Sequence, residues 1–455
     1  MAELNLAHYE DVLGQLPRLK TYSHLLLVFP LLGDRCPDPL IDSIESAAQE
    51  VRNAFPWLAC RVLHEGRGPG NSGVFKLATC PEFAFPNPVV RRKDCTDNFP
   101  TYQEIIDAHG PVAMLDGNIL APLPAFPHIY DDSKLNPAPV LAIQVTVIKG
   151  GLLLDIAAQH NIVDGGSLMR ILDLLAKSMR GEQFSAEEIE HGNRDRTKLI
   201  RLLQSDEPML DHSHLILDPH GASKPPGGRP KAQWRYVRFP VQKRNILKER
   251  ANKEIEGGDE LFISTNDTLS AFIWKRVSAA RLKRRKRPDD LSKFSRALDA
   301  RRALEIPREY LGQMGYNATC FLTFRELETM SVGQIGVFLR QAVREVNTNY
   351  AARSWATLIA NEPNKARIMF GGSFNPDKDI GISSILHANF NNVDFGDLGK
   401  PSLFRRPLFS PLESCVYLWT QTVEGHVDAL LCLIEADWNE LRADVEWSEH
   451  TELIG

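Results

Sequence analysis

A segment without helical or strand periodicity divides this chain of 455 residues near its middle. Residues 206–231 read DEPMLDHSHLILDPHGASKPPGGRPK and are rich in proline, glycine, histidine and aspartate. This composition is typical of a semi-rigid linker rather than of a helix or a strand. We therefore expect two folded domains of similar size, over residues 1–205 and 234–455, joined by a crossover over residues 206–233.

The first half contains segments with both of the regular hydrophobic periods. Residues 40–53, LIDSIESAAQEVRN, carry apolar side chains on one helical stripe, which predicts an amphipathic helix. Apolar and smaller or polar side chains alternate over residues 141–147, as in a β-strand. The sequence KGG at 149–151 provides a turn, and LLLDIAAQ at 152–159 returns, so we expect a β-hairpin here.

The second half opens with a strand-like stretch at residues 234–239 and a strong helix candidate at residues 264–285. Ser264 provides a helix-capping side chain, and the helix ends in a basic run at residues 283–287. A solvated helix end is the simplest interpretation of that run, because cations are favourable at a helix C-terminus. A phosphate contact to a nucleotide-bearing ligand and a nuclear targeting signal are the alternatives. Strands interleaved with helices in both halves predict an α/β fold.

Charge, hydropathy and cysteine content argue against nucleic-acid-binding, membrane-spanning and disulfide-rich proteins. The net charge of −5 does not indicate a nucleic-acid or anionic membrane surface as partner. The apolar run at residues 25–32 is far too short to span a bilayer, and no signal peptide is visible at the N-terminus. The seven cysteines are scattered and odd in number, which argues against a disulfide framework. We expect a cytoplasmic protein that is monomeric.

A histidine followed four residues later by an aspartate occurs four times, so this spacing alone carries no chemistry. Three of the copies lie in proline-rich, polar or linker segments, where solvated pairs are the simplest interpretation. The four copies are His128/Asp132, His160/Asp164, His191/Asp195 and His214/Asp218.

The context of the copy at His160 is different. This histidine follows the predicted strand with the parity of the apolar side chains, so we expect it to be partly enclosed. Gly165 and Gly166 would permit a tight turn and a close backbone approach. A helix with its apolar stripe over residues 168–179 follows at once and is predicted to stop at Gly181. A strand end, a turn and a helix start together are a common position for a catalytic side chain.

An enclosed histidine of this kind can take a proton, because neutral imidazole is available near neutral pH. Positioned proton transfer contributes roughly 10²- to 10⁴-fold in rate. It suits a reaction in which an alcohol or an amine attacks a reactive carbonyl such as a thioester. The alternative is a core histidine that is hydrogen-bonded to its neighbours. The motifs of serine hydrolases, P-loop proteins and zinc proteases are absent from the sequence, and a metal would lack a third ligand at a suitable spacing.

Several segments resemble the BAHD acyltransferases, which are coenzyme A-dependent enzymes, and most closely their fungal branch typified by trichothecene 3-O-acetyltransferase. The resemblance covers the chain from end to end. One departure is DFGDLGKP at 394–401, because the plant enzymes have DFGWGKP there. Condensation domains of peptide synthetases share the fold, but Gln159 replaces the first histidine of their motif. The matching segments, in family order, are LGQLPRL (13–19), FPWLAC (55–60), GGLLLDIAAQHNIVDGG (150–166), STNDTLSAFIWK (264–275), ALDAR (297–301) and DFGDLGKPSLFRRPLFSP (394–411).

The resemblance implies an α/β fold of two similar chloramphenicol-acetyltransferase-like domains. Each would be a mixed sheet with flanking helices, and a long crossover would join them. A solvent channel between the domains would hold His160 at its centre, where the histidine acts as the general base. It would deprotonate the acceptor hydroxyl, which attacks the thioester carbonyl, and would return the proton to the coenzyme A thiolate.

The resemblance also assigns supporting residues around the histidine. Asp164 matches the motif aspartate, which points away from the substrate and pairs with an arginine, and Arg301 of ALDAR is the candidate partner. Gly165 completes the motif. Asp394 and Gly396 match a motif that lies away from the active centre, so they are expected to be structural.

Coenzyme A contacts are expected at Ser264 and Lys283, because this region lies near the donor entrance in such enzymes. The expected co-substrate is acetyl-CoA, and no metal is expected. The predicted reaction is O-acetylation of a hydroxyl on a small secondary metabolite, either a trichothecene-type sesquiterpene or an alkaloid. The alternatives are an N-acyltransferase and a non-catalytic small-molecule-binding protein on the same scaffold.

Overall fold

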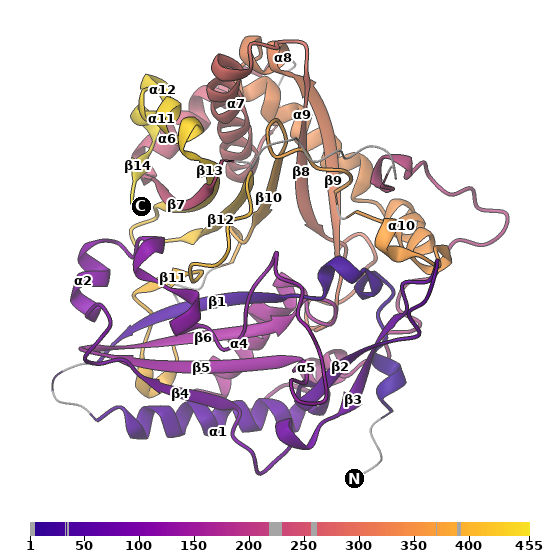
Figure 1. Ribbon diagram of the computed structural model, residues 1–455, viewed down its shortest axis with the longest axis vertical. Helices are drawn as coiled ribbons and strands as arrows, with labels where there is room; N and C mark the ends of the chain where they lie inside the picture. Colours follow the sequence, from indigo (N-terminus) through magenta and orange to yellow (C-terminus); the bar gives the residue numbers. More distant parts are fainter. Residues whose placement is uncertain are drawn as a thin grey trace.

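The computed structural model describes residues 5–31, 33, 36–217, 230–255, 262–369, 371–388 and 393–455. Two large mixed sheets with flanking helices dominate it, one in each half of the molecule (Figure 1). The α/β class expected from the sequence is confirmed. Short 3-10 turns connect several of the elements.

Helices and strands are interleaved along the first half of the chain, with two or three of one kind often in succession. They are β1 (Tyr22–Pro30), α1 (Asp38–Ala54), β2 (Cys60–Glu65), β3 (Val74–Thr79), β4 (Val90–Asp94), α2 (Tyr102–Asp107), α3 (Gly117–Leu120), β5 (Leu141–Ile148), β6 (Gly151–Gln159), α4 (Gly165–Met179) and α5 (Ala186–Gly192).

The second half has more helices. Its elements are β7 (Ala232–Phe239), α6 (Val241–Lys253), α7 (Thr265–Arg285), β8 (Leu291–Asp299), β9 (Gly315–Thr323), α8 (Phe324–Thr329), α9 (Val332–Val346), α10 (Asn349–Asn361), β10 (Ile380–Ser384), β11 (Leu403–Arg405), β12 (Cys415–Gln421), β13 (Val427–Ile434), α11 (Glu435–Arg442), α12 (Val445–His450) and β14 (Glu452–Leu453).

The first sheet has the strand order β11-β1-β6-β5-β4. The predicted hairpin is present as β5 and β6, which pair in antiparallel register from Leu141 opposite Ala158 to Ile148 opposite Gly151. Gly150 has a φ of 78° in the turn, a conformation that glycine adopts without strain. Every residue of β5 and β6 is buried, which explains why the apolar runs are nearly continuous.

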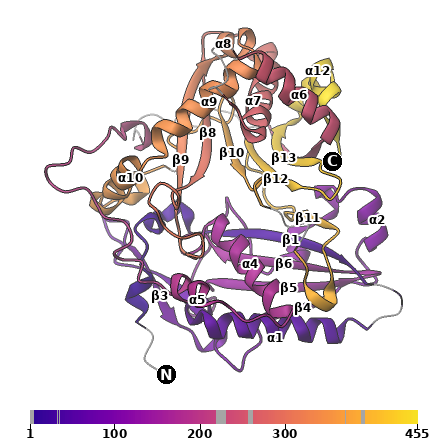
Figure 2. The same cartoon turned by 180° about the vertical axis from the view of Figure 1, so that it is seen from behind.

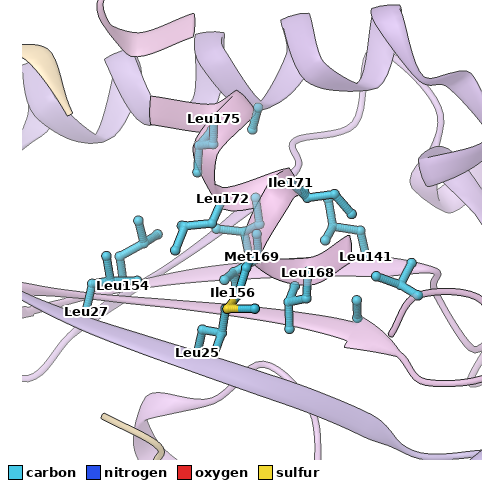
Figure 3. Packing of buried hydrophobic residues seen from close by; sticks show 14 of the residues in the cluster. Leu25, Leu27, Leu141, Leu154, Ile156, Leu168, Met169, Ile171, Leu172 and Leu175 are labelled. Carbon is cyan, nitrogen blue, oxygen red and sulfur yellow. The ribbon is translucent and has the colours of Figure 1, made fainter. Parts of the chain in front are cut away.

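One face of the first sheet is covered by α1 and α4. Leucines of β1 and β6 pack against the apolar stripe of α4, as Figure 3 shows around Leu27, Ile156 and Leu172. Because this core holds α4 against β6, the loop between them at residues 160–164 has fixed ends. The predicted helix at residues 40–53 is confirmed as α1, which packs in the same core.

The second sheet has the strand order β14-β7-β13-β12-β10-β8-β9. Strand β10 is parallel to both neighbours, whereas β8 and β9 are antiparallel. The predicted helix is present as α7, and Ser264 and Asp267 form a reciprocal capping box at its start. Helices α7 and α9 contribute to the buried cluster on this sheet.

Each half of the chain contributes residues to the folded core of the other half. Strand β11, from the second half of the chain, pairs with β1 and completes the first sheet, which Figure 2 shows from behind. In return, Leu13 and Leu16 near the N-terminus pack with Tyr310 and Met314 of the second half.

The predicted linker extends two residues too far, because β7 begins at Ala232 and pairs with β13 there. Its residues 218–229 lie outside the described part of the chain. Within the described ranges, none of the helices combines the length and the apolar character that a membrane crossing requires.

Candidate active site

His160 directly follows β6 and is half-buried. Its backbone N–H donates to the carbonyl oxygen of Thr21, just before β1, over 2.8 Å. The N–H groups of Ile162 and Val163 both turn back to the carbonyl oxygen of Gln159, each over 3.0 Å. These bonds close a tight loop between strand and helix, so the backbone that carries the imidazole is held on both sides.

Asp164 is the N-cap of α4, and its carboxylate is buried. It accepts hydrogen bonds from the backbone N–H of Ser167 and of Met314, each over 2.7 Å. The guanidinium of Arg301 donates two more, over 2.9 and 3.2 Å, so the predicted pair is present. Four donors occupy the roughly four acceptor positions of a carboxylate, so Asp164 is not available to a substrate.

Arg301 extends this connection into the second half of the molecule. Its guanidinium also donates to the carbonyl oxygens of Tyr310 and Gly312 and to the hydroxyl of Ser167. The side chains of Asp164 and Arg301 are each only 7% exposed. This buried pair therefore joins the loop after β6 to the loop before β9.

Electrostatics keep the pair charged. Burial raises the pKa of the Asp164 carboxyl, but the charge and hydrogen bonds of Arg301 outweigh this and hold the pKa below its usual range. Burial lowers the pKa of Arg301, but Asp164 and Asp299 raise it overall. Removing Arg301 would leave Asp164 buried without a cation, and removing Asp164 would leave Arg301 with only the more exposed Asp299 as an ion-pair partner among the described residues; both changes are unfavourable.

Gln313 is the second group at the histidine. Its side-chain nitrogen lies 3.1 Å from Nδ1 of His160 and donates to the His160 carbonyl oxygen over 3.0 Å. The side chain is fully buried, and its oxygen accepts from the N–H of Gly315 over 2.7 Å. Sequence reasoning did not find this residue. A glutamine in YLGQMG has no local signal that separates it from an ordinary core amide.

Asp11 holds the same loop from the N-terminal segment. Its buried carboxylate accepts from the N–H of Gln313 over 3.0 Å, from the Tyr310 hydroxyl over 2.5 Å and from Arg196 over 3.0 Å. Gly312 sits between these groups, and a Cβ there would lie 2.0 Å from the Tyr310 hydroxyl. Sequence reasoning missed Asp11 as well, because its partners lie far away along the chain.

The charge state of His160 follows from its surroundings. Burial lowers the pKa of the imidazole, and its own backbone carbonyl and the charge of Asp164 oppose this only in part. The ring is therefore uncharged at neutral pH. Within the described part of the chain, Nε2 forms no hydrogen bond, whereas Nδ1 lies beside Gln313. An uncharged, half-buried imidazole with a free nitrogen can accept a proton from a bound hydroxyl.

The prediction of a close backbone approach at Gly165 is wrong. A Cβ at Gly165 would meet no atom within 4 Å, and at Gly166 the nearest atoms lie at ordinary contact distance. Both residues begin α4 with negative φ, because the turn is completed earlier, by the loop that ends at Asp164. Gly181, in contrast, has a φ of 71° and ends the helix as predicted.

Asp394 and Gly396 lie at the opposite end of α4. The Arg180 guanidinium donates to the carbonyl oxygen of Asp394, and a Cβ on Gly396 would lie 2.6 Å from the carbonyl oxygen of Met179. At about 1.5 Å per residue, the length of α4 separates them from the histidine loop by roughly 22 Å.

Ser264 and Lys283 are not brought together by the fold. Ser264 caps the start of α7, whereas Lys283 lies in its last turn, roughly 28 Å away along the helix axis. The Lys283 ammonium pairs with Glu440 over 2.9 Å at the surface. As coenzyme A contacts, both stay predictions. Among the described residues, no group of three or more histidine, cysteine, aspartate or glutamate side chains could hold a metal ion.

Two family models match the chain. The model of the trichothecene 3-O-acetyltransferase-like N-terminal domain matches residues 21–179, and that of the Transferase family matches residues 125–448. The second match alone covers more than half of the sequence and includes both His160 and Arg301.

Similar proteins cover the full length. The O-acyltransferase pigD of Monascus ruber is 45% identical over 99% of each chain. The O-acetyltransferase azaD of Aspergillus niger is 42% identical over 99% of this chain and 98% of its own. A crystal structure of F. graminearum TRI101 in complex with coenzyme A and deoxynivalenol has a TM-score of 0.90 and 30% identity, over 98% of this chain and 99% of that one.

Proposed function

Because the chain belongs to the Transferase family of BAHD acyltransferases, it is an acyl-CoA-dependent O-acyltransferase, and we propose that His160 is the general base of its reaction. The environment of the imidazole carries this proposal. The ring is uncharged and half-buried, and Gln313 contacts Nδ1. Hydrogen bonds hold the backbone on both sides of the ring, and Nε2 has no partner among the described residues. No other protein group is needed as a covalent nucleophile.

In the proposed reaction, Nε2 accepts the proton of the acceptor hydroxyl as the oxygen attacks the thioester carbonyl carbon. The new carbon–oxygen bond forms, and the carbon–sulfur bond then breaks. The imidazolium returns its proton to the departing sulfur, so the products are an ester and the free thiol of coenzyme A. His160 is regenerated in its neutral form without a net change in protons.

The donor and acceptor classes follow from the relatives. F. graminearum TRI101 was crystallised with coenzyme A and deoxynivalenol, and azaD is named as an O-acetyltransferase. We infer that acetyl-CoA is the donor here, with Ser264 and Lys283 as candidate contacts. The acceptor is a hydroxyl on a small secondary metabolite. A trichothecene-type alcohol is the first candidate, and an alkaloid alcohol is the second.

The organisation that we propose for the working enzyme follows the family. Residues 1–205 and 232–455 form the two domains, and residues 206–231 form the crossover. The substrates meet at His160 in a channel between the domains. The enzyme acts as a cytoplasmic monomer, without a nucleic-acid or membrane partner.

The test uses acetyl-CoA, a panel of alcohols that includes deoxynivalenol, a matching panel of amines, and a colorimetric readout of free thiol. We expect His160→Ala to lower the rate by about 10²- to 10⁴-fold at an unchanged melting temperature. His128→Ala is the matched control, since it removes the histidine of another His-x-x-x-Asp copy, outside the β6–α4 junction. A His160→Ala rate near that of the wild type would disprove the base. Thiol release with amines but with none of the alcohols would favour N-acyl transfer.

A further inference from the structure

We propose that Gln313 is a positioning residue of this reaction, which holds the His160 ring in place and opposes its protonation. The inference rests on the proposed role of His160 as general base. It assigns to the second half of the chain a direct influence on the catalytic group of the first half.

The orientation of the Gln313 amide follows from its neighbours. The N–H of Gly315 can only donate, and it lies 2.7 Å from one end of the amide, so that end is the oxygen Oε1. The nitrogen Nε2 therefore faces His160. From there it reaches the His160 carbonyl oxygen over 3.0 Å and Nδ1 over 3.1 Å.

This placement acts on the charge of the ring. The amide turns the positive end of its N–H dipoles toward Nδ1, and this disfavours a positive charge on the ring. The neutral ring has no net charge, so the amide disfavours it less than the imidazolium, even when its proton is on Nδ1. Gln313 thus adds to the effect of burial and keeps the base uncharged.

The same amide also acts on the position of the ring. For Nε2 to accept a proton, the neutral ring must carry its own proton on Nδ1, where the His160 carbonyl oxygen can receive it. Gln313 donates to that same oxygen, which has two lone pairs. By holding this carbonyl, Gln313 fixes the group that receives the Nδ1 proton and so sets the orientation of the ring.

The other charged groups around the ring are already paired. Asp164 acts on His160 by its charge, but its carboxylate is bound to Arg301. Asp11, on the N-terminal segment, holds the Gln313 backbone and is paired with Arg196. Nδ1 therefore contacts a neutral amide. A carboxylate in the same position would raise the pKa of the imidazole and make it a stronger base.

A weak base suits the second half of the reaction. The imidazolium must give its proton to a thiolate, whose conjugate thiol has an ordinary pKa of about 8.5. A carboxylate beside Nδ1 would stabilise the imidazolium and slow this return. The amide keeps His160 basic enough to take the proton and acidic enough to release it.

The experiment compares Gln313→Glu and Gln313→Met by two readouts. The first is the pKa of His160, from side-chain ¹⁵N spectra of histidine-labelled enzyme between pH 5 and pH 10, with His160→Gln to assign the signal. The second is thiol release from acetyl-CoA with the same alcohol panel over that pH range. Circular dichroism at the assay temperature verifies that each variant is folded.

In Gln313→Glu we expect the pKa of His160 to rise by about one unit or more, because a carboxylate favours the imidazolium. The rate would fall near neutral pH and recover above the new pKa. In Gln313→Met we expect a smaller rise and a rate about 10- to 100-fold lower at every pH, because the ring is no longer held.

Gln144→Met is the matched control, because it removes another buried glutamine amide, on β5, that bonds the Ile119 carbonyl oxygen. It should lower the melting temperature and leave the pKa of His160 unchanged. If neither Gln313 variant moves this pKa relative to the wild type, the inference is overturned, even where the rate falls. If His160→Ala retains the rate, the proposed function fails, while the spectra still report the effect of Gln313.

Discussion

The two ends of helix α4 are both closed by residues from the second half of the chain, but by different chemistry. At the N-terminal end, Asp164 and Arg301 form a buried ion pair beside the histidine. At the C-terminal end, Arg180 pairs with Glu182 near the surface and donates to the Asp394 backbone. Buried charge is concentrated where the direction of a side chain matters, whereas the other end only has to hold the helix in place.

The largest effect should come from breaking the buried pair at the first end. Asp164→Asn removes the buried counter-charge of Arg301 and leaves it with Asp299, whose side chain is 54% exposed, so we expect a cost of about 3 kcal/mol of folding free energy. We also expect at least a tenfold loss of rate, because the loop that carries His160 loses its connection to the second half. Urea unfolding and the thiol assay measure the two effects. An unchanged unfolding midpoint would contradict the structural role.

The pH dependence of stability sharpens this prediction. The pKa of Asp164 is lower in the folded protein than its unfolded value of about 3.9. Its contribution is therefore fully present above pH 4 and is lost as the pH falls through the folded pKa. The difference in melting temperature between wild type and Asp164→Asn should be constant from pH 5 to pH 7 and shrink below pH 4. A difference that grows on acidification would be inconsistent with the depressed pKa.

A smaller effect is expected from the backbone at the second end. Gly396 has a φ of 60°, and a Cβ would lie 2.6 Å from the Met179 carbonyl oxygen. Gly396→Ala should therefore cost about 1–3 kcal/mol through backbone strain and the close contact. We expect turnover per folded molecule to stay at the wild-type level, since α4 separates this site from His160. A loss of turnover at full folding would show that the two ends are coupled.

The smallest effect belongs to the surface pair at that end. Arg180→Ala removes an ion pair whose side chains are 30% and 49% exposed. Such pairs contribute about 0–1 kcal/mol, and added salt screens them. Thermal melts with and without added NaCl should differ little between variant and wild type. A shift as large as that of Asp164→Asn would remove the contrast between the two ends.

Much of the fold could be predicted from short stretches of sequence. The hairpin of β5 and β6, the helices α1, α4 and α7, and the Ser264 cap all depend on residues that are neighbours along the chain. The pairing of Asp164 with Arg301 was predicted only through the family resemblance. Gly165 was misjudged, because a glycine after a motif aspartate does not show whether the turn comes before or after it.

The sequence by itself determined the two-layer α/β elements, the family and the position of His160 at a strand–helix junction, because period, caps and motifs are local. Only the tertiary structure decided what surrounds the imidazole. Gln313 meets His160 across 153 residues, Asp11 meets Gln313 across 302, and β11 joins a sheet of the other half. These partners are selected by how the two halves pack, and no local pattern in the chain encodes that packing.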